Sequence, residues 1–179
     1  MREDKAKELI LYIAQQCARD EKFGAVKLNK ILYYADFAVY RELGQPISGM
    51  TYRHLSEGPV PYELPRLRDA LIKEGAASVN YVDYFGYIQE RLVSEREPDV
   101  SCLTDREIAL VDKAISWLEP YSAAQVSELS HAEFGWRVTA SGEEIPYRTA
   151  WLSLQPLSQE QVEAGQKLGD KLGLLRKAA

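Results

Sequence analysis

The chain has 179 residues and a mass of 20.3 kDa, which is the size of one ordinary domain. Hydrophobic residues make up 46% of it and charged residues 27%, a composition that excludes an intrinsically disordered protein. Its 22 basic and 27 acidic residues give a net charge of −5, whereas a nucleic-acid-binding domain is typically basic.

Two amphipathic helices are predicted at the start of the chain. Apolar residues recur every three or four positions between Ala6 and Cys17, which places them on one helical stripe. A stronger pattern runs from Leu28 to Leu43 and ends at Gly44, a residue typical of a left-handed helix cap. Aromatic residues widen the apolar surface of this second helix, so we expect it to be the central helix of the fold.

Glycine and proline interrupt residues 47–61, where we expect the short stretch Met50–Leu55 to be extended at best. A third helix is predicted to begin near Pro61 or Tyr62 and to end at Lys73, with Pro65 in its first turn.

The next two segments predict a β-hairpin. Val79–Val82 and Tyr87–Val93 are rich in β-branched and aromatic residues, as strands are. The four residues 83–86 between them end in glycine and are interpreted as the connection.

Three helix-start signals follow in the second half of the chain. Thr104–Glu107 matches a capping box and opens a helix to about Leu118, and Ser122–Gln125 opens a shorter one that ends near His131. Ser158–Gln161 opens a terminal helix with a sparse apolar stripe at Val162, Leu168, Leu172 and Leu175. Three glycines weaken that helix, so we expect this tail to be frayed or ordered only by a partner.

Together these elements predict a mostly helical α+β fold, a compact helical domain with one small β-hairpin. We expect residues 1–150 to form the domain and residues 151–179 to be an extension of the same globular unit that carries a marginal helix.

The sequence offers no sign of catalytic or metal chemistry. His54, His131, Cys17 and Cys102 are the only imidazoles and thiols, and none are paired at metal-ligand spacing. Nucleophile-elbow and phosphate-loop motifs are missing as well. We therefore expect no enzyme activity, no metal and no cofactor. The two distant cysteines, the polar start and the lack of a long apolar run predict a cytoplasmic protein without a leader or a membrane span.

A DNA-binding regulator is the alternative interpretation. The pair of helices predicted between Thr104 and His131 resembles a helix-turn-helix, although its second helix has no lysine or arginine to meet phosphates. DNA binding by the chain alone is therefore not expected, and the test is a gel shift at low salt.

Tyrosine and lysine supply the candidate partner-binding residues. The chain has 11 tyrosines against 4 phenylalanines and 3 tryptophans, and tyrosine is frequent at protein interfaces. Lys27 and Lys30 lie one turn apart on the side of the central helix opposite its apolar stripe, where they can meet an acidic partner. The proposed partner-binding residues are Lys27, Lys30, Tyr33, Tyr34, Tyr84 and Tyr87.

Three sequence blocks resemble a known family. Lys27–Asp36 reads KLNKILYYAD, Glu57–Pro61 reads EGPVP, and Leu129–His131 is followed by Trp136. In this order they resemble the signatures of the Panacea domain, the SocA-like antitoxin family found in phage-associated proteins, over about residues 5–150. The family-motif residues in this chain are Leu28, Leu32, Gly58, Pro59, Val60, His131 and Trp136.

The resemblance implies an antitoxin that binds and neutralises a co-encoded protein toxin. For one branch of the family it implies an adaptor or chaperone-like role, in which the toxin is delivered to a protease. From the residues themselves we interpret Gly58-Pro59 as a fixed turn, His131 as a cap on the end of its helix, and Trp136 as core packed over it.

Overall fold

The structure is a computed structural model that describes residues 1–152 and 158–172. Its helices are α1 (Glu3–Gln16), α2 (Ala25–Leu43), α3 (Leu64–Lys73), α4 (Asp105–Leu118), α5 (Ala123–His131), α6 (Phe134–Arg137) and α7 (Gln159–Lys171), with 3-10 helices η1 (Val100–Cys102) and η2 (Tyr147–Trp151). Its strands are β1 (Tyr52–Leu55), β2 (Gly58–Pro61), β3 (Ala77–Tyr84) and β4 (Tyr87–Ser94). The predicted mostly helical α+β class is confirmed.

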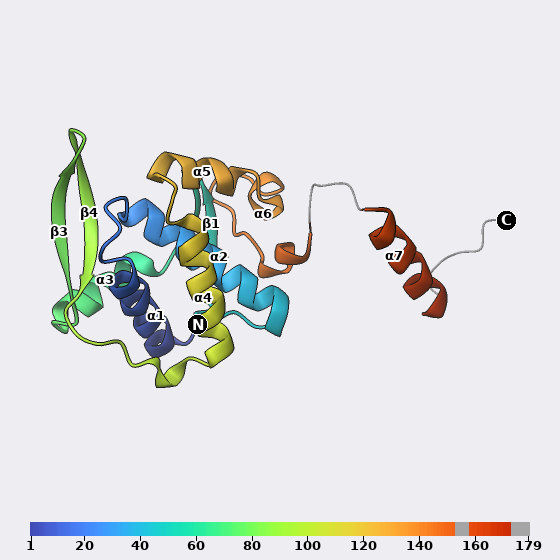
Figure 1. Cartoon of the computed structure of the whole chain (residues 1–179), viewed down its shortest axis with the longest axis horizontal. Helices are drawn as coiled ribbons and strands as arrows, with labels where there is room; N and C mark the ends of the chain where they lie inside the picture. Colours follow the sequence, from blue (N-terminus) through green and yellow to red (C-terminus); the bar gives the residue numbers. More distant parts are fainter. Residues whose placement is uncertain (153–157, 173–179) are drawn as a thin grey trace.

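The helix α2 is the centre of the body, as predicted. It packs against α1, α4, α5, β2 and η2, and Figure 1 shows α1 and α4 beside it. Leu32, Ala35 and Val39 lie one turn apart and are fully buried. The helix ends at Gly44, whose left-handed φ of 77° is the predicted cap. Burial of this apolar stripe, rather than helix propensity alone, holds α2 in place.

The structure contains two small antiparallel hairpins where the sequence predicted one. The segment expected to be extended at best forms β1, which pairs with β2 from Tyr52↔Pro61 to Leu55↔Gly58. The sequence pattern missed β2 because Pro59 and Pro61 have no N–H for a ladder. Proline is tolerated here since β2 is an edge: the other side of β1 is bonded to residues 142–145, with Ile145 N donating to Tyr52 O at 2.8 Å.

The predicted hairpin is confirmed, but its turn is shorter than expected. Strands β3 and β4 pair from Ala77↔Ser94 to Tyr84↔Tyr87, which leaves only Phe85 and Gly86 in the loop. Both have positive φ, 52° and 82°, as in the type I′ turns that match the twist of a two-stranded ribbon. The expected four-residue connection was therefore wrong, because the ladder continues through residues 83 and 84.

The helix starts follow their capping residues. The boxes predicted at Thr104 and Ser122 are both formed and open α4 and α5. The start of α3 differs from the prediction: it begins at Leu64, because Pro61 belongs to β2 and the Tyr62 amide donates to Thr51 O at 2.8 Å.

The helix α7 lies apart from the body in Figure 1. It starts at the predicted cap, where the Gln161 amide donates to the Ser158 hydroxyl at 3.2 Å. Its apolar residues Val162, Leu168 and Leu172 are 40%, 57% and 58% exposed. Leu175, the last residue of the predicted stripe, lies outside the described residues.

None of the helices in the described ranges has the length and apolar character that a bilayer crossing requires.

Candidate functional site

The three motif blocks meet where α2, β2 and α5 pack together. Lys30 on α2 donates from its ammonium to the Pro59 carbonyl of β2 at 3.2 Å. Gly58 precedes Pro59, and the buried Ser130 of α5 lies against it. Residues far apart in the chain are thus brought into one cluster, which we call the motif cluster: Lys30, Gly58, Pro59, Ser130, His131 and Trp136.

Gly58 is required by the close packing of the motif cluster. Its φ of 96° is in the left-handed region, and a Cβ there would lie 2.1 Å from Ser130 Oγ and 2.9 Å from Lys30 Cε. No side chain fits that space, so Gly58 allows β2 to approach both helices. The turn predicted at Gly58-Pro59 is wrong, because these two residues begin strand β2 and the turn lies at residues 56 and 57.

Trp136 joins β1 to the end of α5. The imidazoles of His54 and His131 both stack on its indole with centroids 4.2 Å away, and its Nε1 donates to the Leu55 carbonyl at 3.1 Å. The expected packing of Trp136 on His131 is confirmed. The expected helix cap is wrong, because His131 Nε2 is buried without a hydrogen-bond partner in the described part of the chain and the ring lies against Trp136 instead.

Lys27 and Lys30 do not form the exposed basic face that the sequence predicted. Lys27 is 1% exposed, and its ammonium lies 2.5 Å from an Asp20 oxygen and 2.8 Å from the Glu119 carbonyl. Lys30 is 0% exposed. The aliphatic parts of both lysine side chains pack with the core. The prediction from helical periodicity, which places lysine in solvent, was therefore wrong for Lys27 and Lys30. Neither ammonium can contact a partner in this conformation.

Burial makes the folding free energy depend on the protonation of Lys30. Desolvation lowers the pKa of Lys30 from 10.5 to about 8 in the folded protein. Between these values the unfolded chain binds a proton that the folded protein releases, so the free energy of unfolding rises with pH.

We expect this rise to approach about 1.4 kcal/mol per pH unit between pH 8 and 10, and to vanish in Lys30→Met. Urea unfolding of both proteins across that range measures it. The comparison removes the tyrosine titrations, which both proteins share. A parallel pH dependence in the two proteins would show that Lys30 keeps an ordinary pKa.

Of the two tyrosines predicted on α2, Tyr33 is buried and Tyr34 is half-buried. Tyr33 is 2% exposed, and its ring centroid lies 4.2 Å from that of Phe37 and 5.5 Å from that of Tyr52. Tyr33 is thus a core residue and not a contact residue. Tyr34 reaches the surface beside Trp117, with ring centroids 4.8 Å apart.

Sequence analysis missed the buried carboxylate of Asp36. Its oxygens accept hydrogen bonds from the Ser48 amide at 2.9 Å, from the Ser48 hydroxyl, from Tyr52 at 2.8 Å and from Tyr147 at 3.3 Å. Burial raises the pKa of this carboxyl, and the hydrogen bonds oppose that rise. These hydrogen bonds connect three segments that are distant in the chain. No local sequence pattern could therefore identify the residues that donate them.

A groove of about 290 Å³ runs beside Tyr34 between α2, α4 and η2. Aromatic side chains form much of its wall, and Arg41, Lys113 and Glu133 are its charged lining residues. The Tyr34 hydroxyl is buried near Glu133; burial raises the pKa of Glu133, and the Tyr34 hydroxyl opposes that rise. The sequence analysis missed this groove because its walls come from separate helices.

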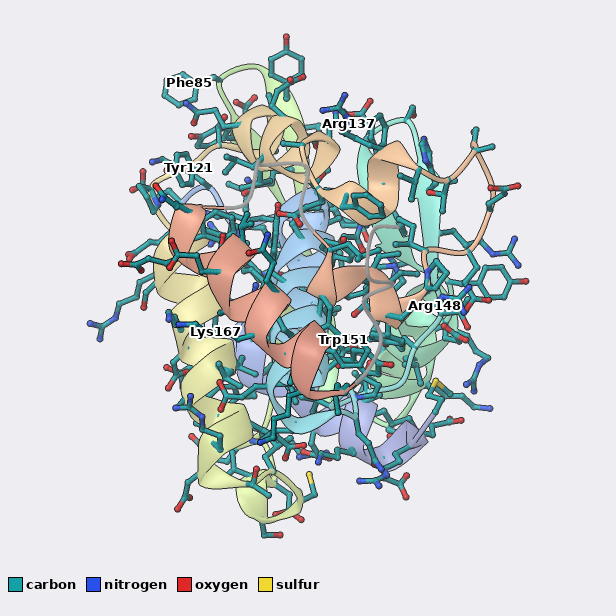
Figure 2. All side chains as sticks on the ribbon, turned by 90° about the vertical axis from the view of Figure 1, so that its right-hand side faces the viewer. Phe85, Tyr121, Arg137, Arg148, Trp151 and Lys167 are labelled. Carbon is teal, nitrogen blue, oxygen red and sulfur yellow. The ribbon has the colours of Figure 1, made fainter. Side chains whose placement is uncertain are left out.

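The tip of the β3–β4 hairpin carries the most exposed large apolar side chains of the described residues. Phe85 is 86% exposed, Tyr87 78%, Tyr81 70% and Ile88 69%. Tyr84 is half-buried against Phe85, with ring centroids 4.8 Å apart. Figure 1 shows the hairpin extending beyond the helices, and Figure 2 shows Phe85 at the margin of the molecule. We call these five residues the hairpin tip.

The described part thus combines a helical body, the motif cluster and a projecting aromatic hairpin. The sequence profile described as "Antitoxin SocA-like, Panacea domain" matches residues 28–137, which include all three motif blocks. The chain belongs to this family. Among curated proteins, none matches the chain.

Proposed function

We propose that this protein is a non-catalytic antitoxin that neutralises a co-encoded protein toxin by direct contact, and that the hairpin tip is the contact surface. Membership of a SocA-like antitoxin family supports a toxin as the partner. The proposal keeps Tyr84 and Tyr87 from the predicted partner-binding residues. It omits Lys27, Lys30 and Tyr33, because the structure buries them.

The observation that most supports this proposal is the exposure of large apolar side chains at the hairpin tip. Monomeric proteins rarely leave such a cluster open to water unless it binds something. Tyrosine and phenylalanine bury a large area at a small cost in side-chain entropy, which suits them to the centre of an interface. A projecting ribbon also presents both of its faces to a partner.

The turn conformation adds a second reason. Phe85 has a φ of 52°, in a region where glycine and asparagine are usual and other side chains are strained. Folding gains little from this residue, because its side chain is 86% exposed. An exposed aromatic held in a strained turn is typical of a functional contact.

We propose the cytoplasm as the place of action, since both Cys17 and Cys102 are free thiols. Delivery of the bound toxin to a protease or chaperone would be a later step, for which the body opposite the hairpin stays available.

Titration distinguishes contact from catalysis. We expect neutralisation of the toxin by the full chain to saturate at a fixed molar ratio of the two proteins, because every toxin molecule must be covered. The measurement adds increasing protein to a fixed amount of purified toxin and follows the toxin's activity. Full suppression at a small fraction of that ratio would indicate turnover, and the contact mechanism would then be wrong.

A further inference from the structure

The helix α7 has an apolar face and nothing packed against it in the described structure. Val162, Leu168 and Leu172 are all at least 40% exposed. The helix has only 13 residues, and an isolated helix of that length is marginal in water. Gly165 and Gly169 weaken it further. Tertiary contacts would therefore stabilise α7.

The glycines of α7 lie on its apolar face. Val162, Gly165, Gly169 and Leu172 follow one another at spacings of three or four, so they share one side of the helix. A Cβ added at Gly165 would meet nothing within 4 Å in the described structure. Glycines in this place lower helix stability but flatten the surface between two aliphatic residues. Such a flat strip accepts the face of an aromatic ring.

The groove between α2, α4 and η2 offers aromatic rings of this kind. Trp117 is 43% exposed at its wall, and Tyr34 lies beside Trp117. Trp151 is 55% exposed on the adjoining η2, where its ring centroid is 4.8 Å from that of Tyr40. These rings and the apolar face of α7 are the complementary exposed surfaces on this side of the molecule.

The groove and α7 are connected by a short stretch of the same chain. Thr149 and Ala150 of η2 line the groove, and α7 begins a few residues later. The six Cα–Cα steps from Leu152 to Ser158 span at most about 20 Å. Closure of α7 over the groove is therefore a step within one chain. Figure 2 shows α7 on the same side of the molecule as Trp151, in front of α2 and α4.

We infer that α7 closes over the groove of its own chain, with Val162, Gly165 and Leu172 packed on Tyr34, Trp117 and Trp151. The structure shows the open arrangement, in which the apolar face of α7 and the rings of the groove are exposed to water. The closed arrangement buries both of these apolar surfaces. In the closed state α7 is a lid on the groove. It leaves the hairpin tip, on the other side of the body, free to bind a partner (Figure 1).

Hydrogen exchange of the full chain tests this without any toxin, so its outcome is independent of the proposed function. We expect the amides of residues 159–172 to exchange at least about tenfold more slowly than in an unfolded peptide. The double variant Val162→Asp/Leu172→Asp should lose this protection. Trp117→Ala should lose it too, although the substitution is in α4 and not in α7.

Lys167→Asp is the matched control, because it places the same acidic side chain on the polar face of α7 and should keep the protection. Exchange of wild-type α7 at the unprotected rate would overturn the inference. Protection that survives Trp117→Ala would overturn it as well. Protection that disappears on dilution would show that α7 occupies the groove of a second copy, which contradicts closure within one chain.

Discussion

Phe85→Ala and Tyr87→Ala should each weaken toxin binding by about thirtyfold or more while the domain stays folded. Truncation of an aromatic residue at the centre of an interface costs about 2 kcal/mol or more, which corresponds to that factor. The fold should tolerate both changes because the two side chains are 86% and 78% exposed. Calorimetry or interferometry with purified toxin measures the affinity, and a thermal melt checks the fold.

Tyr62→Ala is the control for this experiment. Tyr62 is 59% exposed and lies between β2 and α3, away from the hairpin, where its ring is covered by Arg53 at 4.0 Å. We expect its loss to leave toxin affinity unchanged. Tyr84→Ala should have a smaller effect than Tyr87→Ala, because Tyr84 is half-buried against Phe85. Wild-type affinity in all the hairpin variants would mean that the toxin binds elsewhere.

The helices were predictable because their signals are local. The capping boxes at Thr104 and Ser122, and the Gly44 cap of α2, each act within one turn of helix, so the sequence alone identifies them. The β1–β2 hairpin was not predictable in the same way. Its proline-containing strand is stable only because residues 142–145 pair with the other side of β1, which is a contact across more than 80 positions.

The candidate site was predictable only in part, for a related reason. The clustering of tyrosines around the predicted hairpin led us to expect Tyr84 and Tyr87 at the surface, and the structure places Tyr87 78% exposed and Tyr84 half-buried. Helical periodicity was the basis for placing Lys27 and Lys30 at the surface. It cannot recognise a buried lysine. Lys27 is held by Asp20 and by the Glu119 carbonyl, one from the loop before α2 and one from the end of α4. Charge complementarity of that kind depends on the assembled fold.

Lys27→Glu should prevent the protein from folding. The change places a carboxylate within the 1%-exposed environment of Lys27, beside the Asp20 carboxylate that now pairs with it at 2.5 Å. Two like charges without water or counter-ions cannot both be accommodated, and an unpaired buried charge alone costs about 3–5 kcal/mol. That loss is comparable with the total stability of an ordinary domain. Circular dichroism and solubility of the purified variant show the result.

Two further variants allow the change in the free energy of unfolding to be measured. Lys27→Met keeps the shape of the buried stem but leaves Asp20 unpaired, and should lower the free energy of unfolding by about 3 kcal/mol in a urea titration. Lys73→Glu makes the same charge reversal at an exposed lysine of α3 and should change stability by no more than about 0.5 kcal/mol. If Lys27→Glu folds and has the melting temperature of the wild-type protein, burial of Lys27 is contradicted. Lys27 would then be a surface residue. The motif lysine is expected instead to act inside the body, where it ties the start of α2 to the end of α4 and supports the domain from which the hairpin projects.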